Sequence, residues 1–187
     1  MQKRIDKTNY YLDIAETVAE RSTCSKRKYG AIIVKNDEII SSGFNGAPRG
    51  VKDCLESGEC NRQNAERGMD YSNCLAVHAE QNAIISACRS EMLDSTLYLV
   101  GYSLENRLIQ LPPTVAVESS VVTPCTFETV KTYVDNAEPC SLCKRMIVNA
   151  GIKEVVIRLN KDEKRNVYNV KHLPVKVCGK NDLIGGY

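Results

Sequence analysis

His78-Ala79-Glu80-Gln81-Asn82-Ala83-Ile84 lies near the middle of the chain and starts a predicted helix that continues to about Cys88. Its small and apolar residues recur at the three- and four-residue spacing that places them on one face of a helix. The segment Thr96-Leu97-Tyr98-Leu99-Val100 then predicts a strand. A helix followed by such a strand is typical of proteins in which helices pack on a sheet.

The same alternation continues on both sides of this segment. The predicted helices are residues 8–21 with Thr8 as the cap, residues 78–88, and the segment from Cys140 to Gly151. The predicted strands are Ala31–Val34 and Ile39–Ser42, which form a hairpin, then residues 96–100, and Glu154–Ile157. Between them, residues 43–50 predict a loop. We therefore expect a mixed sheet covered by helices and, because no repeat or linker appears, a single domain over residues 1–187.

The composition limits the class of protein. Apolar residues make up 43% and charged residues 26% of the chain, and the net charge of +2 gives little attraction for polymeric nucleic acid. No apolar run approaches the ~20 residues that span a bilayer, and residues 1–6 lack the apolar core of a secretory signal. We expect a cytoplasmic protein with no membrane partner, in which nine cysteines favour metal binding over disulfides.

Two short motifs have the residue types of a metal site: His-x-Glu at 78–80 and, far downstream, Pro-Cys-x-x-Cys at 139–143. Cys140 and Cys143 are three residues apart, so both sulfurs project from one side of a helix start, where the dipole favours the thiolate. With His78 they fill three positions of a tetrahedral Zn²⁺ and leave the fourth for water, whose pKa zinc lowers to about 7.

Glu80 is not a ligand in this arrangement, so it can take a proton from that water and deliver protons to a ring nitrogen and a departing amine. Zinc-dependent nucleobase deaminases use this His-x-Glu and Pro-Cys-x-x-Cys arrangement, and the predicted reaction is therefore hydrolytic deamination. A structural zinc knuckle, or two packing thiols, is the alternative. Structural sites usually close with a fourth protein ligand and need no carboxylate beside the histidine, which favours a catalytic site.

The chain resembles the cytidine deaminase superfamily and, within it, the deoxycytidylate (dCMP) deaminases. Four segments support the resemblance: Lys28–Val34, Gly43–Pro48, His78–Ile84, and Pro139–Cys143 leading into Ala150-Gly151-Ile152-Lys153. The resemblance implies an α/β, three-layer α-β-α cytidine deaminase-like fold with a mixed central sheet of about five strands. It also implies zinc-dependent hydrolytic deamination of dCMP to dUMP, which feeds thymidylate synthesis.

By the same resemblance, Asn45 binds the deoxyribose hydroxyl, Ala79 contacts the substrate, and the assembly is a homo-oligomer, a hexamer or a dimer. Phe44 stands where the family usually has tyrosine. Many members are activated by dCTP and inhibited by dTTP, with Mg²⁺ at a second site that we do not assign to residues. Arg49 is either a phosphate contact, because a guanidinium binds phosphate through two hydrogen bonds, or an exposed loop charge.

The remaining cysteines allow more than one interpretation. Four of them, in loop-like sequence, either bind a second, structural Zn²⁺ or are ordinary buried thiols. These four are Cys24, Cys54, Cys60 and Cys74. We expect Cys88 and Cys178 in the core or without a role and His172 at the surface, and the role of Cys125 stays open.

An insertion at about 101–138 departs from the family, which usually runs from the preceding strand to Pro139 in a few residues. Thr114–Val117 and Val130–Val134 have strand character, and the insertion is a hairpin, a lid or an oligomer contact. Because it enters near the site, we expect it to gate access or to replace oligomer contacts of the family.

Other functions stay open at this point. A deaminase of a related substrate, such as dCTP, cytidine or another nucleobase, shares the zinc site. A tRNA adenosine deaminase should have a basic surface, which a net charge of +2 does not support, and a riboflavin-pathway enzyme typically has a fused reductase domain, for which the chain is too short. A non-catalytic zinc-binding or nucleotide-sensing protein has no use for a proton carrier at Glu80.

Overall fold

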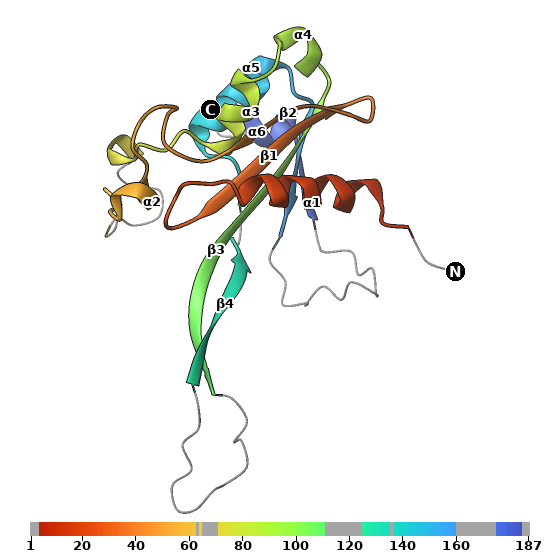
Figure 1. Ribbon diagram of the computed structural model, residues 1–187. Helices are drawn as coiled ribbons and strands as arrows, with labels where there is room; N and C mark the ends of the chain where they lie inside the picture. The colour runs from red at the N-terminus through yellow and green to blue at the C-terminus, as the bar shows by residue number, and fades with distance from the viewer. Residues whose placement is uncertain are drawn as a thin grey trace, which may run out of the picture.

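A mixed sheet lies between helices on both of its faces in the computed structural model, which describes residues 4–62, 64, 71–110, 125–134, 137–159 and 175–184 (Figure 1). The helices are α1 (Lys7–Ala19), α2 (Cys54–Ser57), α3 (Ala79–Ile85), α4 (Arg89–Met92), α5 (Ser141–Ala150) and α6 (Lys180–Ile184), with a 3₁₀ turn at Tyr71–Asn73. The strands are β1 (Lys28–Lys35), β2 (Glu38–Phe44), β3 (Thr96–Gln110), β4 (Cys125–Tyr133), β5 (Glu154–Arg158) and β6 (Val175–Gly179).

The strand order in the sheet is β2-β1-β3-β5-β6, and β4 pairs with β3 outside this path. Strand β3 runs antiparallel to β1 and β4 and parallel to β5. The outer strands β2 and β6 are antiparallel to their neighbours. The predicted α-β-α fold with a mixed sheet is confirmed. The sheet has six strands instead of about five, because the insertion supplies β4 in addition to the five strands of the main path.

Each face of the sheet has its own hydrophobic core, because successive side chains of a strand point to opposite faces. On one face, Leu12 and Ala15 of α1 pack with Ile32 and Val100. On the other face, α3 and α5 cover the sheet, and the buried residues there include Ala31, Ile33, Leu97, Leu99, Ala83 and Ile147. Strand β1 is therefore buried on both sides, which explains why its sequence is a continuous apolar run.

Helix α1 begins one residue before the predicted start, and its cap is Asp6 instead of Thr8. Asp6 Oδ1 accepts a hydrogen bond from the backbone N–H of Asn9 at 3.0 Å, which satisfies one of the unpaired donors of the first turn. The helix lies so close to β1 that a Cβ atom on Gly30 would be 2.0 Å from the carbonyl oxygen of Ala15. Packing of α1 on the sheet therefore requires glycine at position 30.

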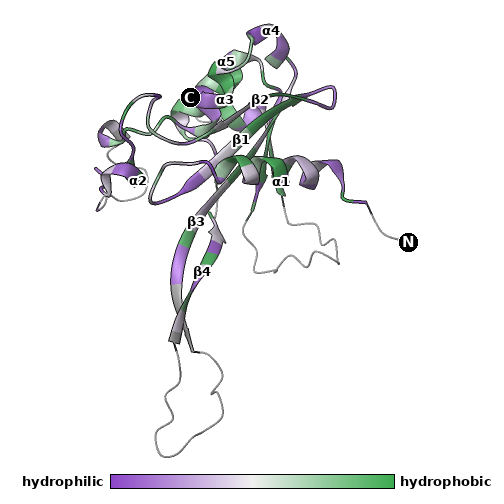
Figure 2. Cartoon of the chain, viewed as in Figure 1, coloured by the Kyte–Doolittle hydropathy of each residue, from purple (hydrophilic) through white to green (hydrophobic). Residues whose placement is uncertain are grey.

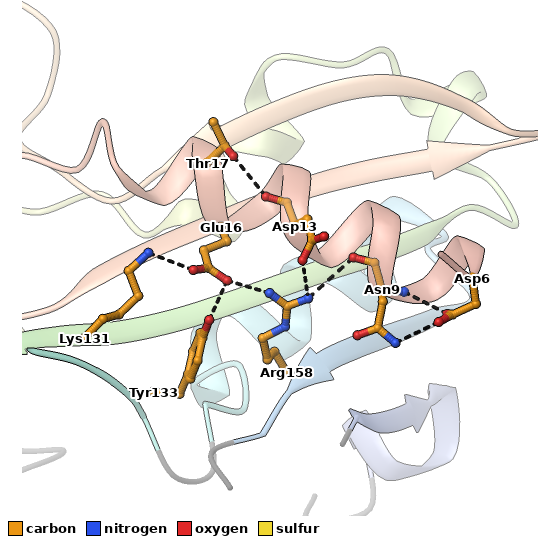
Figure 3. Close-up of polar contacts among 8 residues, drawn as sticks. All are labelled: Asp6, Asn9, Asp13, Glu16, Thr17, Lys131, Tyr133 and Arg158. Carbon is orange, nitrogen blue, oxygen red and sulfur yellow. Dashed lines mark hydrogen bonds and ion pairs between the residues drawn. The ribbon is translucent and has the colours of Figure 1, made fainter. Parts of the chain in front are cut away.

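An ion network around the buried Arg158 joins α1, β4 and β5, as Figure 3 shows. The side chain of Arg158 is 1% exposed and donates to Glu16 at 2.5 Å and to Asp13 at 2.8 Å. Lys131 and Tyr133, both on β4, also donate to Glu16, each at 2.7 Å. Because three donors from two strands meet at one carboxylate, Glu16 fixes the base of β4 to α1.

The insertion forms a two-stranded arm that projects from the rest of the molecule (Figure 1). Strand β3 continues past Val100, and β4 returns beside it with Tyr133 opposite Tyr102. Leu104 is 47% exposed and Phe127 is 72% exposed, and Figure 2 shows hydrophobic and hydrophilic residues interspersed along the arm. The expected extra hairpin is therefore present, and the roles of lid and oligomer contact stay predictions.

The sequence patterns do not predict α4, β6 and α6, which have at most five residues each. The predicted strand at Thr114–Val117 and the residue His172 lie outside the described residues. Within the part of the chain that is described, no helix is both long enough and apolar enough to cross a membrane.

Candidate metal centre

Three side chains with metal-binding atoms meet where helices α3 and α5 begin. His78 is the cap of α3, Cys140 is the cap of α5, and Cys143 lies in the first turn of α5. His78 Nδ1 is 3.6 Å from Cys140 Sγ and 3.4 Å from Cys143 Sγ, and the three donor atoms all lie within 4.8 Å of one another. The structure thus places the two helix starts side by side, as the motif spacing requires.

Contacts with strand β2 fix the position of helix α3. A Cβ atom on Gly43 would lie 2.3 Å from the backbone nitrogen of Ala83, so the helix rests directly on the strand. Asn82 Nδ2 donates to the carbonyl oxygen of Phe44 at 2.7 Å, and Ser41 Oγ donates to the carbonyl oxygen of Ala83 at 2.8 Å. These contacts set the direction in which the start of α3 presents its side chains.

The electrostatics of the three residues favour a thiolate at Cys140. A hydrogen bond from Cys143, together with one from His78, outweighs partial burial and lowers the pKa of Cys140 to about 3. The same hydrogen bond and burial raise the pKa of Cys143, which keeps its proton in the absence of metal. The hydrogen bond with Cys140 outweighs burial and raises the pKa of His78.

This donor set fits Zn²⁺. Imidazole and thiolate are ligands that zinc prefers, and a metal displaces the protons they carry. Among the described residues, the cluster of close donor atoms has three members, which is the number found in catalytic zinc sites with a position open to water.

Glu80 lies beside the three donor atoms. It is the second residue of α3, it is 5% exposed, and its carboxyl group hydrogen-bonds with the Cys143 thiol. Burial is the largest influence and raises the pKa of Glu80 above the usual range, although the charge of His78 opposes this shift. A buried carboxyl group therefore stands next to the metal-binding atoms.

The loop after β2 brings Asn45 close to this centre. Gly46 exchanges backbone hydrogen bonds with Val77, the residue before His78, at 2.8 and 3.1 Å. Asn45 is 7% exposed; its Oδ1 accepts from the N–H of Tyr29 at 2.7 Å, and its Nδ2 donates to the carbonyl oxygen of Arg27 at 2.9 Å. The contact between Asn45 and a sugar hydroxyl stays a prediction.

The other two residues expected to contact substrate differ in exposure. Ala79, in the first turn of α3, is 0% exposed, whereas Arg49 is exposed in the loop. The sequence patterns do not single out the basic turn Lys26-Arg27-Lys28, which Asn45 holds through the carbonyl group of Arg27. Three consecutive cations were a visible signal, but only the fold places them beside Asn45.

The four additional cysteines are close enough to influence one another. Each is half-buried and free of a disulfide. Burial raises the pKa of Cys54, and the charges of Cys24, Cys60 and Cys74 raise it further. Their donor atoms are not gathered within 4.8 Å as those of the centre at His78 are. A second zinc site at these residues stays a prediction.

Cys88 and Cys178 lie apart from both groups of cysteines. Cys178 is buried, as expected for a core residue, and Cys88 is exposed on the loop before α4. Cys125 begins β4 at the far end of the arm.

Comparison with known proteins agrees with this geometry. Residues 5–159 match the family model of the cytidine and deoxycytidylate deaminase zinc-binding region. The chain is 31% identical over 160 residues to the deoxycytidylate deaminase of Mycobacterium phage D29, and the alignment covers 82% of this chain and 94% of the relative. It is 30% identical over 150 residues to the deoxycytidylate deaminase of Schizosaccharomyces pombe. That alignment covers 79% of this chain but only 35% of the relative's length.

The chain is also similar to a solved structure, the dCMP deaminase from cyanophage S-TIM5 in complex with dCMP and dUMP. The two sequences are 26% identical, the TM-score is 0.48, and the alignment covers 81% of this chain and 82% of the other. The match of the family model over most of the chain, together with the phage relative, establishes the family. This chain belongs to the zinc-dependent cytidine and deoxycytidylate deaminase family.

Proposed function

We propose that this protein holds a catalytic Zn²⁺ through His78, Cys140 and Cys143 and deaminates dCMP to dUMP. The observation that supports the proposal most strongly is a buried carboxyl group, Glu80, beside the three donor atoms. A structural zinc site does not need such a group, because its metal is closed by protein ligands. Hydrolysis needs it, because protons must move between water, ring and leaving group.

The reaction adds water at C4 of the cytosine ring and releases ammonia. When bound to this donor set, Zn²⁺ lowers the pKa of a water molecule to about 7. Glu80 accepts a proton from the attacking water on its carboxylate and passes it to ring nitrogen N3. The second proton of the water follows to the amino group, and the C–N bond breaks as the C4 carbonyl forms. Burial raises the pKa of Glu80 above its ordinary value, and a buried carboxyl group in this position can both accept and return a proton.

The choice of dCMP as substrate rests on the relatives and on the residues around Asn45. Two relatives, of which one matches over nearly its full length, are deoxycytidylate deaminases. The predicted sugar contact, Asn45, holds the basic turn that contains Arg27, and the exposed Arg49 follows in the same loop. We propose that Arg27 and Arg49 contact the 5′-phosphate and that Ala79 contacts the base.

The substrate proposal is tested by ammonia release from dCMP, deoxycytidine, dCTP, cytidine and cytosine with zinc-loaded protein. We expect the highest kcat/KM for dCMP. Arg27→Gln and Arg49→Gln should raise KM for dCMP and leave turnover of deoxycytidine unchanged, and the exposed Arg21→Gln serves as the control. Equal turnover of dCMP and deoxycytidine would contradict the phosphate contact, and no turnover of any compound would favour the nucleotide-sensing alternative.

We also propose that Cys24, Cys54, Cys60 and Cys74 hold a second, structural Zn²⁺. Four thiolates form the closed ligand set of structural zinc sites. In this protein the four thiols come from separate segments, and the charges of three of them act on Cys54. A metal at this place would join the segment after α1 to the segment around α2.

Zinc content per chain tests the second site. Fully loaded wild type should contain two zinc ions, and both Cys54→Ser and Cys140→Ser should contain one, whereas the exposed Cys88→Ser should keep two. Cys54→Ser should unfold at a lower temperature. One zinc ion per chain in the fully loaded wild type would contradict this part of the proposal.

The proposal further includes a single domain over residues 1–187, a cytoplasmic location, a homo-oligomeric assembly (hexamer or dimer), and regulation by dCTP and dTTP with Mg²⁺. Polymeric nucleic acid is not among the proposed ligands. This part rests on the resemblance to the family. Light scattering tests the assembly. Rates of ammonia release with added dCTP or dTTP test the regulation, and an unchanged rate with both nucleotides would exclude them as effectors.

A further inference from the structure

Glu138, which lies two residues before the metal-binding Cys140, is joined to two lysines from different elements. Its Oε2 atom accepts a hydrogen bond from Lys144 of α5 at 3.2 Å, and its Oε1 atom accepts one from Lys176 of β6. Both contacts are also ion pairs, so the hydrogen bonds are charge-assisted. One carboxylate therefore connects the segment that enters α5, α5 itself and an outer strand of the sheet.

The contact with Lys144 spans the part of the sequence that contains Cys140 and Cys143. The backbone N–H of Lys144 also donates to the carbonyl oxygen of Cys140 at 2.8 Å. Helix starts are usually held by a side chain that caps the first turn. In the described structure the Cys140 side chain contacts His78 and does not cap α5. The ion pair of Glu138 thus supplies a link across the first turn of α5 that the capping residue itself does not provide.

The contact with Lys176 relates this segment to the sheet. Lys176 lies opposite Ile157 in the antiparallel pair of β5 and β6. The residues on either side of Glu138, Ala137 and Pro139, are buried, so the backbone that leads to α5 is packed against the rest of the molecule. On the other side of the metal centre, α3 is held to the sheet by its contacts with β2. Both helix starts that meet at the centre are therefore positioned from the sheet, one through β2 and one through β6.

We propose that Glu138 is a positioning residue of the metal centre: its two lysine contacts hold the thiols of Cys140 and Cys143 at the spacing that receives Zn²⁺. The inference rests on the proposed function, because that function places zinc at this centre. The side chains of Glu138 and Lys144 are each 24% exposed and that of Lys176 is 44% exposed, and ion pairs so accessible to water contribute little to folding stability. The main effect of the network is therefore on metal binding, where groups that orient ligands typically change the affinity by about 10- to 100-fold.

Zinc affinity of the full-length protein tests the proposal. Competition with a chelator gives the dissociation constant, and Co²⁺ in place of zinc gives an absorption spectrum that depends on the number and geometry of the thiolate ligands. Glu138→Gln, which removes the charge and keeps the size of the side chain, should weaken zinc binding by about 10- to 100-fold and change the Co²⁺ spectrum. Glu38→Gln, exposed on β2, should change neither. Comparison with Cys140→Ser identifies the zinc that belongs to this centre.

A second comparison tests whether the two lysines are responsible for the effect. Lys144→Met combined with Lys176→Met should weaken zinc binding as Glu138→Gln does. Adding Glu138→Gln to that protein should cause no further loss, because the three side chains act as one network. Lys7→Met, which removes the exposed ion pair with Asp37, should leave the zinc affinity unchanged.

Two results would overturn the proposal. The first is a zinc affinity and a Co²⁺ spectrum of Glu138→Gln that equal those of wild type. The second is a lower stability of metal-free Glu138→Gln in urea with unchanged zinc affinity, because Glu138 would then serve folding alone. Wild-type zinc affinity in Cys140→Ser would instead contradict the ligands assigned in the proposed function, so failure of one proposal can be distinguished from failure of the other.

Discussion

At the scale of single residues, Asn45 has a structural task that is separate from any contact with substrate. Its side chain satisfies the N–H of Tyr29 at the start of β1 and the carbonyl group of Arg27 in the turn before it. Because Asn45 is 7% exposed, water has little access to replace either hydrogen bond. The asparagine therefore joins the loop after β2 to the basic turn.

Replacement of Asn45 by alanine should lower the free energy of unfolding by about 1–3 kcal/mol, the cost of leaving buried polar groups without a partner. Urea denaturation measures this loss. Ser42→Ala, at an exposed position on the preceding strand β2, serves as the control and should change stability by less than about 0.5 kcal/mol. Equal stability of the two variants would contradict the structural role of Asn45.

The metal-binding residues were predictable from sequence because their chemistry is local. Cys140 and Cys143 lie within one helical turn, and the offset between His78 and Glu80 needs no knowledge of distant contacts. The partners of Asn45 were not predictable, since they depend on how the loop after β2 meets the turn before β1. Only pairing of the two strands brings these segments together.

At the scale of elements, the ion network around Glu16 holds α1, β4 and β5 together. Burial raises the pKa of Glu16, but hydrogen bonds from Lys131 and Tyr133 and the charge of Arg158 outweigh it, and the pKa is lowered overall. A carboxyl group with a lowered pKa in the folded state stabilises the fold above its unfolded pKa of about 4.3. This stabilisation is lost as the pH falls through the folded pKa.

Glu16→Gln should therefore lower stability at pH 7 by up to about 3 kcal/mol, the effect of removing one member of a buried ion pair, and should flatten the loss of stability below about pH 4.3. Urea denaturation between pH 3 and pH 7 measures both effects. Glu20→Gln on the same helix is the matched control, because Glu20 is 62% exposed and lies 3.8 Å from Lys131. If Glu16→Gln and Glu20→Gln gave the same pH profile, the network would not have the proposed role.

The elements that the sequence predicted are those with strong local patterns. Helices α1, α3 and α5 have apolar residues at helical spacing, and strands β1 and β5 are short apolar runs. The sequence did not predict β6 and α6, because five residues carry too little periodicity. The full length of β3 was also missed, because its second half is defined by pairing with β4 across the insertion.

At the scale of the whole molecule, the arm is the feature that departs most from a compact α-β-α domain (Figure 1). Two strands alone are marginally stable in water, and the exposed Leu104 and Phe127 increase the apolar surface of the arm. Contacts with another copy of the chain would cover this surface.

Joining Leu104 to Lys131 through a short turn should leave folding and zinc content intact, because Lys131 and Tyr133 keep their hydrogen bonds to Glu16 and the base of the arm remains paired. If the arm serves assembly, light scattering should show fewer chains per particle in the shortened protein; if it serves access to the site, KM should change. An unchanged number of chains per particle together with unchanged kcat and KM would show that the arm has neither role.

The most direct test of the proposed chemistry compares Glu80→Gln with wild type for ammonia release from dCMP, with zinc content measured in the same samples. Zinc-loaded wild type should release ammonia. Glu80→Gln should reduce kcat by about 100- to 10,000-fold while binding the same amount of zinc, because it removes the proton carrier and no ligand. Glu38→Gln, at an exposed position on β2, should behave as wild type. Wild-type turnover by Glu80→Gln, or no ammonia from zinc-loaded wild type, would contradict the account.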